Sequence, residues 1–546
     1  IIVWVVRQKQ NDSADYFLGG RDATWLAIGA SIFASNIGSE HLIGLAGAGA
    51  SSGMAMAHWE IQGWMILILG WVFVPFYTRS MVYTMPEFLE RRYNPQSRTI
   101  LSVISLVSYV LTKVAVTVYA GGLVFQQVFG IKELWGIDFF WIAAIGLVVL
   151  TALYTIFGGM KSVLYTSVLQ TPILLLGSLI ILVLGFKELG GWDEMMRVCG
   201  AVTVNDYGDT MTNLIRSNDD ANFPWLGALI GSAIIGFWYW CTDQFIVQRV
   251  LSGKNEMEAR RGTIFGAYLK LLPVFLFLIP GMIAFALHQK YIGAGGEGFL
   301  PMLANGTANA DAAFPTLVAK LLPAGVKGLV VCGILAALMS SLASLFNSSA
   351  MLFTIDFYKR FRPETPEKKL VGIGQVATVV IVILGILWIP IMRSVGDVLY
   401  TYLQDVQSVL APGIAAAFLL GICWKRTSAQ GGMWGLISGM VIGLTRLGAK
   451  VYYSNAGEVA DSTFKYLFYD MNWLFFCGWM FLFCIIVVIV VSLATEAPTA
   501  EKIQGLVFGT ATKKQKAATR ASWNHWDIIH TVIILAITGA FYWYFW

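Results

Sequence analysis

Residues 31–44 read "SIFASNIGSEHLIG", and this stretch decides the fold. Apolar sequence leads into it and out of it, yet the part from Ser35 to His41 is rich in small and polar residues. Irregular backbone at membrane depth is tolerated only where it is buried in protein or lines a cavity. We therefore expect a membrane helix that is unwound near the middle of the bilayer and lines a binding site.

The composition predicts an all-α polytopic membrane protein. Of its 546 residues, 57% are hydrophobic and only 13% are charged, and the mean hydropathy is +0.68. Soluble domains carry roughly 25% charged residues. The net charge of +5 is spread over loops, so we expect no nucleic-acid partner. The chain has no GxxxxGK[ST] motif and no visible catalytic domain, so we expect neither an enzyme nor an ATP-driven pump.

About fourteen apolar segments are long enough to span the bilayer. The basic residues orient them, because 24 Lys and Arg fall in one alternate set of loops and 11 in the other. The richer set is expected on the cytoplasmic side of a multi-pass plasma (inner) membrane protein. The expected spans are a truncated fragment at 1–6 and segments at 25–50, 57–78, 99–128, 138–157, 163–186, 225–248, 263–288, 328–356, 370–392, 396–422, 430–449, 471–494 and 526–546.

Two consecutive runs of five spans follow the N-terminal fragment. An odd number of spans makes the second run enter the membrane from the opposite side, which is the topology of an inverted repeat in secondary transporters. We expect an extra helix and cytoplasmic segment at 1–24, a first repeat with its outer loop at 25–221, an inverted second repeat at 222–422, and additional helices at 423–546.

Several polar residues within spans have two interpretations each. Ser340 and Ser341 lie beside Ser344 on one helix face, where they serve either close helix packing or a hard cation such as Na⁺. Glu60 and Lys270 form either a structural pair or a site for the hydroxyl groups of a polyol.

The aromatic run around Tyr239 has two interpretations as well. It is either a membrane-interface belt or a cavity wall that stacks against a sugar ring. Gln404 adds an amide to a span that Pro412 and Gly413 interrupt.

Seven motifs together resemble the sodium–glucose cotransporters of the solute:sodium symporter family. The resemblance covers residues 15–450 and implies a LeuT-type five-plus-five inverted repeat. It implies import of a monosaccharide such as glucose or galactose, with Na⁺ as the coupling ion. The motifs are "FASNIGSEHLIGLAG", "YTMPEFLERRY", "TALYTIFGG", "WYWCTDQFIVQR", "YLKLLPVFLFLIPGM", "LMSSLASLFNSS" and "APGIAAAFLLGICWKR".

The same resemblance implies roles for individual residues. Tyr239 matches the family's inner gate. The family's Na⁺ site falls on the carbonyl groups of Ala34, Ile37 and Ala337 and on the hydroxyl groups of Ser340 and Ser341. Its sugar-binding positions match Asn36, His41, Glu60, Tyr239, Trp240, Lys270 and Gln404, and its outer gate matches Leu45, Trp59 and Tyr400.

Departures from the family pattern refine these expectations. Ser167 stands where many members have Asp, and Ala343 stands where members with a second Na⁺ site have a hydroxyl group. We therefore predict one Na⁺ per sugar. Gly236 replaces a polar side chain of some members, which leaves the exact sugar open. Because other members of the wider family carry other solutes, inositol, sialic acid or another small solute is an alternative substrate. A sugar sensor that does not transport is a further alternative. The single Cys199 in the outer loop 187–224 favours a bacterial source.

Overall fold

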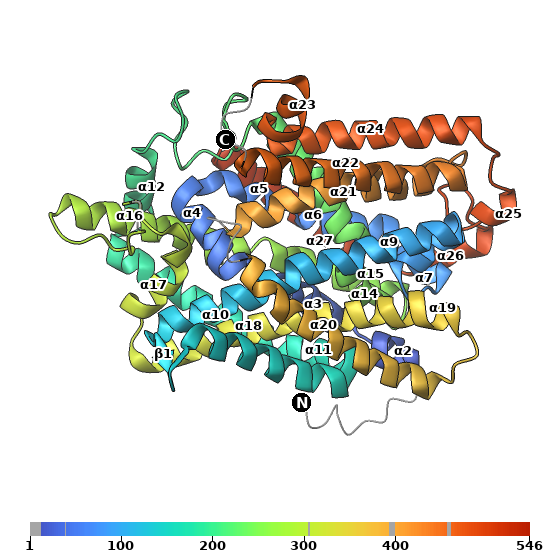
Figure 1. Ribbon diagram of the computed structural model, residues 1–546, viewed down its shortest axis with the longest axis horizontal. Helices are drawn as coiled ribbons and strands as arrows, with labels where there is room; N and C mark the ends of the chain where they lie inside the picture. Colours follow the sequence, from blue (N-terminus) through green and yellow to red (C-terminus); the bar gives the residue numbers. More distant parts are fainter. Residues whose placement is uncertain (1–11, 39, 304–305, 393–398, 456–459) are drawn as a thin grey trace.

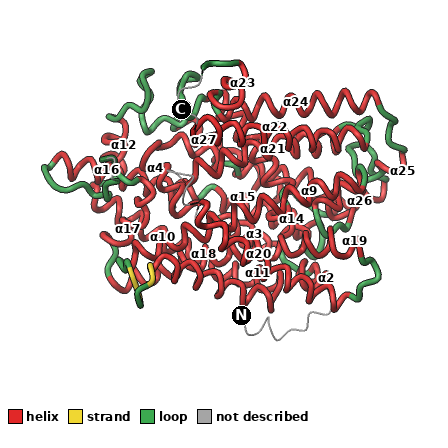
Figure 2. The backbone as a smooth tube through the Cα atoms, viewed as in Figure 1, coloured by secondary structure: helices red, strands yellow, loops and turns green. Residues whose placement is uncertain are grey.

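The computed structural model describes residues 12–38, 40–303, 306–392, 399–455 and 460–546. Most of the described residues are helical, and they include one short antiparallel hairpin, β1 (Glu133–Leu134) with β2 (Ile137–Asp138), at an edge of the bundle (Figure 2). The truncated helix expected at 1–6 lies outside the described residues.

The first part of the chain contains the interrupted helix predicted from the opening stretch. Two of its later helices continue through π-helical turns, η4 (Leu69–Phe73) and η5 (Tyr109–Val114). The helices are α2 (Ser13–Leu18), η1 (Gly19–Arg21), α3 (Trp25–Asn36), η2 (Glu40–Leu45), α4 (Ala46–Ser52), η3 (Gly53–Met56), α5 (Ala57–Glu60), α6 (Gly63–Ile68), α7 (Val74–Ser80), α8 (Met85–Arg92), α9 (Pro95–Ser108), α10 (Ala115–Phe129), α11 (Phe139–Leu189) and α12 (Trp192–Gly200).

The second part begins after the outer loop and is also interrupted early, because η6 (Phe237–Thr242) and α14 (Gln244–Leu251) follow α13 (Trp225–Gly236). The remaining helices to the end of this part are α15 (Glu256–Lys270), η7 (Val274–Leu278), α16 (Ile279–Gly293), η8 (Ala310–Ala312), α17 (Ala313–Leu321), α18 (Ala324–Met351), η9 (Leu352–Tyr358), α19 (Lys359–Phe361), α20 (Glu367–Met392) and α21 (Leu399–Cys423).

The C-terminal part adds long helices to the outside of the bundle (Figure 1). Its elements are α22 (Ala429–Asn455), α23 (Thr463–Lys465), η10 (Tyr466–Asp470), α24 (Trp473–Ala494), α25 (Ala500–Ile503), α26 (Lys513–Ala521) and α27 (His525–Tyr544).

Among the described residues, nine helices are long and apolar enough to cross a membrane. One of them, α11, has 51 residues. A straight helix of that size would be about 76 Å long, against ~30 Å of hydrocarbon, so it forms two spans. The turn lies at Gly159, whose φ is 53°. A Cβ atom there would come within 2.5 Å of the Tyr16 carbonyl oxygen, so the position requires glycine. The total of about fourteen spans stays a prediction.

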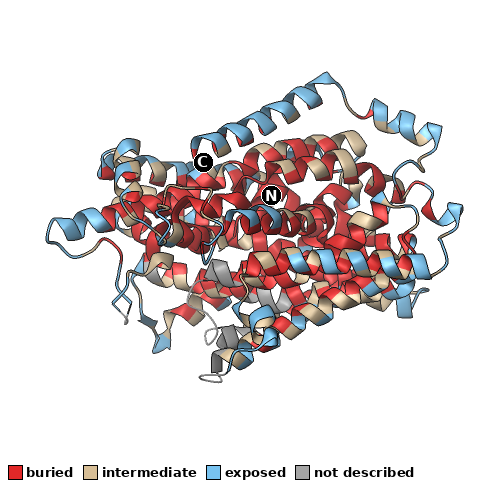
Figure 3. Ribbon diagram, turned by 90° about the horizontal axis from the view of Figure 1, so that it is seen from above, coloured by how far each residue is buried: buried red, intermediate tan, exposed pale blue. Residues whose placement is uncertain are grey.

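The interrupted helix α3 lies in the centre of the bundle (Figure 1) and packs against α11, α15 and α18. Buried residues gather in the middle of the molecule, and exposed residues follow its outer helices (Figure 3). Many of the exposed residues are large and apolar, such as Leu153, Val183 and Ile486. An apolar outer surface around a buried polar centre is the arrangement expected of a protein in a lipid bilayer.

Candidate functional site

The helix predicted to unwind is interrupted after Asn36. The Ile37 N–H donates to the Phe33 carbonyl at 2.9 Å, and Ile37 itself is extended, with φ −79° and ψ 106°. Beyond the break, the N–H groups of His41 and Leu42 donate to the Gly38 carbonyl at 3.1 and 3.3 Å. The last four carbonyl groups of a helix lack partners within it. The break therefore provides backbone oxygens, including that of Ala34, in the protein interior.

The serine face of α18 meets this break. The Ser35 and Ser344 hydroxyl oxygens are 2.7 Å apart, and a Cβ atom at Gly38 would lie 2.9 Å from the Ser341 hydroxyl oxygen. Ser340 and Ser341 are each 1% exposed. Ala34 of α3, Ile37 directly after the end of α3, and Ala337 of α18 are buried as well. Uncharged oxygen ligands from two elements suit a hard monovalent cation, so the arrangement fits Na⁺. The coordination roles of these residues stay predictions.

The position that departs from the family pattern lies beside this crossing. The Ser167 hydroxyl donates to the Val163 carbonyl at 2.6 Å, and its oxygen is 3.2 Å from that of Ser340. Ala343, on α18, is fully buried. Neither side chain carries a charge, so these two positions supply no anionic ligand to a second cation.

Hydrogen bonds connect four of the predicted substrate-binding residues in a buried polar chain, and a fifth, His41, lies beside it. The Lys270 ammonium donates to Glu60 Oε2 at 2.6 Å and to Asn36 Oδ1 at 3.2 Å. The Asn36 amide in turn donates to the Tyr239 hydroxyl at 3.2 Å. His41 Nε2 lies 3.3 Å from Glu60 Oε2. Since Glu60 and Lys270 are 1% and 3% exposed, this is a desolvated network in which opposite charges are directly paired.

All seven predicted substrate-binding residues line one cavity of about 40 Å³. Gln404 Oε1 is buried in this wall and has no hydrogen-bond partner among the described residues. The complete lining is Asn36, Glu40, His41, Trp59, Glu60, Gln62, Lys113, Ile235, Gly236, Tyr239, Trp240, Lys270, Leu403, Gln404 and Gln407.

One residue of the predicted outer gate, Trp59, packs against aromatic side chains from other parts of the chain. Trp59 stacks on Trp473 of α24, with ring centroids 5.5 Å apart and an interplanar angle of 21°. Its ring also meets the edge of Phe223, from the outer loop, at 6.1 Å. Leu45 is fully buried at the end of η2. Tyr400 lies in α21, but its side chain falls outside the described residues.

The cavity is also lined by polar residues that were not among the predicted substrate-binding residues, among them Lys113, Gln62 and Gln407. Lys113 pairs with Asp243 at 2.6 Å, and the Tyr109 hydroxyl donates to the same carboxylate. The Lys113 ammonium lies 4.6 Å from the centre of the Tyr239 ring. Lys113 and Asp243 could have been singled out from the sequence, because each is a charged residue within an expected span. That signal alone does not distinguish a functional role from a structural one. Gln407 and Gln62 carry no comparable signal, because their sequence context is that of an ordinary polar position.

A helix broken inside the bundle and a buried polar cavity beside it are the arrangement of a secondary transporter. The chain belongs to the sodium:solute symporter family, whose family model matches residues 16–439. Sodium is accordingly its coupling ion. The expected membership of this family is confirmed, and the expected bacterial source stays a prediction.

Two relatives illustrate the similarity within the family. The chain is 37% identical over 518 residues to the sodium/myo-inositol cotransporter 2 of Homo sapiens, covering 92% of this chain and 76% of that protein. It is 37% identical over 525 residues to the sodium/myo-inositol cotransporter of Canis lupus familiaris, covering 92% and 72%.

Solved structures confirm the LeuT-type fold. A Na⁺-coupled sialic acid symporter in a substrate-bound outward-open state superposes with a TM-score of 0.71 at 22% identity, covering 91% of this chain and 95% of the other. Mhp1, a nucleobase-cation-symport-1 family transporter in a closed conformation, gives a TM-score of 0.50 at 13% identity, covering 94% and 99%. At these identities the likeness concerns the fold alone.

Proposed function

We propose that this symporter uses Na⁺ to import a neutral cyclic polyol across the plasma membrane. The bonded chain of Lys270, Glu60, Asn36 and Tyr239 carries the proposal, since it lines the cavity and contains strong donors and acceptors side by side. Every hydroxyl group of a polyol both donates and accepts, so it can insert between such groups and satisfy them. Gln404 Oε1, which has no hydrogen-bond partner within the described part of the chain, offers one more acceptor.

The charges of the cavity favour a neutral substrate over an anionic one. The ammonium groups of Lys270 and Lys113 each lie 2.6 Å from a carboxylate oxygen, of Glu60 and Asp243 respectively. Binding a carboxylate such as that of sialic acid would leave an extra negative charge in a desolvated site, which is costly without a cation of its own. A neutral ring with several hydroxyl groups makes no such demand.

Among neutral polyols, myo-inositol is the first candidate and a hexose such as glucose or galactose is the second. The relatives at 37% identity are named for myo-inositol. The motif resemblance to sodium–glucose cotransporters favours the hexose. Both molecules are six-membered rings with an apolar C–H face, which suits stacking on an aromatic side chain such as Tyr239.

Coupling follows from the position of the broken helix. Na⁺ held by the carbonyl groups of Ala34, Ile37 and Ala337 and the hydroxyl groups of Ser340 and Ser341 fixes the unwound segment, and the same segment carries Asn36 and His41 toward the polyol. By thermodynamic linkage, Na⁺ raises the affinity for the polyol by the same factor by which the polyol raises the affinity for Na⁺. The uncharged Ser167 and Ala343 support a ratio of one Na⁺ per polyol.

Uptake by proteoliposomes tests the substrate. An inward Na⁺ gradient should drive accumulation of labelled myo-inositol. Unlabelled glucose, galactose and sialic acid should each inhibit this uptake in proportion to their own affinity for the site. If sialic acid inhibits uptake at concentrations well below those at which unlabelled myo-inositol does, the proposal of a neutral substrate is contradicted. Saturable binding of myo-inositol without any accumulation would instead identify a sensor.

A further inference from the structure

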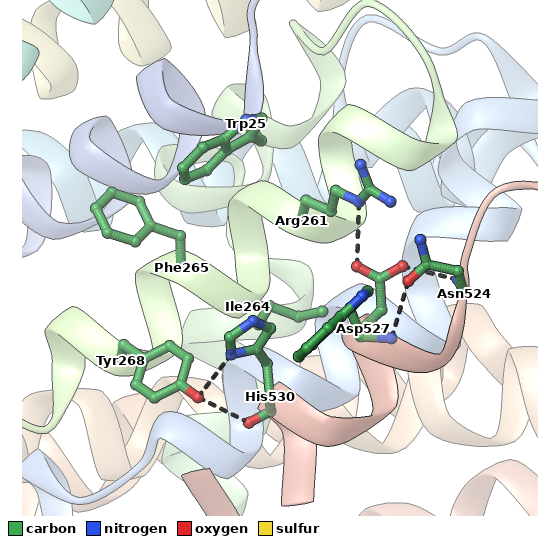
Figure 4. A pocket seen from close by; sticks show the side chains of 9 residues that line it. Trp25, Arg261, Ile264, Phe265, Tyr268, Asn524, Asp527 and His530 are labelled. Carbon is green, nitrogen blue, oxygen red and sulfur yellow. Dashed lines mark hydrogen bonds and ion pairs between the residues drawn. The ribbon is translucent and has the colours of Figure 1, made fainter. Parts of the chain in front are cut away.

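A second crevice lies outside the substrate cavity, between α3, α15 and α27 (Figure 4). It has a volume of about 540 Å³. Several of its residues are exposed on the outside of the bundle, among them Trp25 at 41% and Trp526 at 58%. The lining residues are Trp25, Arg261, Ile264, Phe265, Tyr268, Asn524, Trp526, Asp527 and His530.

The crevice lies at the cytoplasmic edge of the membrane. The distribution of basic loop residues places the N-terminal ends of α15 and α27 on the cytoplasmic side. Arg261 and Asn524 stand near those ends, and Tyr268 lies seven residues further along α15, which corresponds to about 10 Å of depth. This depth covers the polar headgroup region, roughly 5–8 Å thick in each leaflet, and the beginning of the hydrocarbon.

The polar groups are arranged by depth. At the mouth, Arg261 Nε donates to Asp527 Oδ1 at 3.1 Å, and the Arg261 side chain remains 34% exposed (Figure 4). The other oxygen of Asp527 accepts the Asn524 N–H at 2.9 Å. Deeper in the crevice, the Tyr268 hydroxyl lies 3.0 Å from His530 Nδ1. A cationic group at headgroup level therefore stands above a polar pair, with aromatic walls between them.

A basic segment leads directly to the mouth of the crevice. Helix α26 precedes α27 and carries Lys513, Lys514, Lys516 and Arg520, all exposed, and it has no acidic residue. Clusters of this kind on the cytoplasmic side of a membrane helix attract anionic lipids. We propose that the crevice binds an anionic glycerophospholipid of the cytoplasmic leaflet, with its phosphate at Arg261 and its glycerol esters at the level of Tyr268 and His530. This site is independent of the polyol that the protein carries.

Thermal unfolding of the purified full-length chain in detergent tests this site. Added phosphatidylglycerol should raise the unfolding temperature clearly more than phosphatidylcholine does, and inorganic phosphate alone should leave it unchanged. Equal effects of the two phospholipids, or no effect of either, would overturn the proposal. A rise with inorganic phosphate equal to that with phosphatidylglycerol would show a free-anion site instead and would overturn the lipid assignment.

Variants locate the effect, each measured against its own lipid-free unfolding temperature. Arg261→Gln should lose at least half of the rise caused by phosphatidylglycerol, and Arg261→Lys should keep most of it. His530→Trp fills the crevice from an exposed position and should also reduce the rise, which provides the test if Arg261→Gln does not fold. Arg197→Gln, on the outer helix α12, is the matched control and should respond like the wild type. Full responses from both crevice variants would overturn the proposal.

Discussion

The buried pair of Glu60 and Lys270 allows the sharpest prediction. The two side chains are 2% and 4% exposed and their charged atoms lie 2.6 Å apart, so water does little to screen either charge. Removing one partner of such a pair leaves an uncompensated buried charge and costs about 3–5 kcal/mol. Glu60→Gln and Lys270→Gln should each lower the free energy of unfolding by about this amount. The double variant, which buries no unpaired charge, should be less destabilised than the sum of the two by at least about 2 kcal/mol.

The assay is a double-mutant cycle in mixed detergent micelles, combined with uptake. Hydrogen bonds to charged groups contribute about 1.5–3 kcal/mol, so each single variant should also raise the KM for the polyol roughly ten- to a hundredfold. Strictly additive stability changes would refute the direct coupling of the two charges. A folded single variant with an unchanged KM would refute their role in binding.

Three further perturbations test other parts of the account. Ser341→Ala should raise the Na⁺ concentration for half-maximal uptake about tenfold with little loss of stability, since one ligand hydroxyl group is removed. Ser349→Ala, on the same helix, is the control, and equal Na⁺ dependence of the two variants would contradict the ion site. Gly159→Ala should destabilise the protein by about 1–3 kcal/mol, because φ is 53° and the Cβ atom meets the Tyr16 carbonyl oxygen, so wild-type unfolding would contradict the tight turn. Trp473→Ala removes the ring that stacks on Trp59. A cysteine introduced into the cavity should then react faster with a labelling reagent added on the outer side, and an unchanged rate would contradict an outer gate closed by this stack.

The sequence predicted the parts of the site whose signal is local. The small and polar residues from Ser35 to His41 cannot continue an undisturbed apolar span, and the helix breaks between Asn36 and the turn that begins at Glu40. Glu60 and Lys270 are costly in a membrane unless paired or functional, so each is conspicuous by itself. Their direct contact, across 210 positions of the chain, is a result of tertiary packing.

The rest of the site depends on packing alone. Trp59 and Trp473 are far apart in sequence, and nothing in either context indicates that they stack. The aromatic run around Tyr239 fits an interface belt equally well until Lys113, from another helix, is seen beneath the ring. By contrast, the turn within α11 was visible in the sequence, because the expected spans at 138–157 and 163–186 separate where Gly159 interrupts the helical backbone.

The most direct test of the account is the charge that enters with each polyol molecule. Tracer uptake of myo-inositol and the accompanying current can be measured in the same proteoliposomes under an inward Na⁺ gradient. We predict accumulation against the polyol gradient that stops when Na⁺ is replaced by K⁺, with one positive charge per polyol. Accumulation that persists in K⁺ would contradict sodium-driven uptake through this site, and two charges per polyol would contradict the single Na⁺ that Ser167 and Ala343 imply.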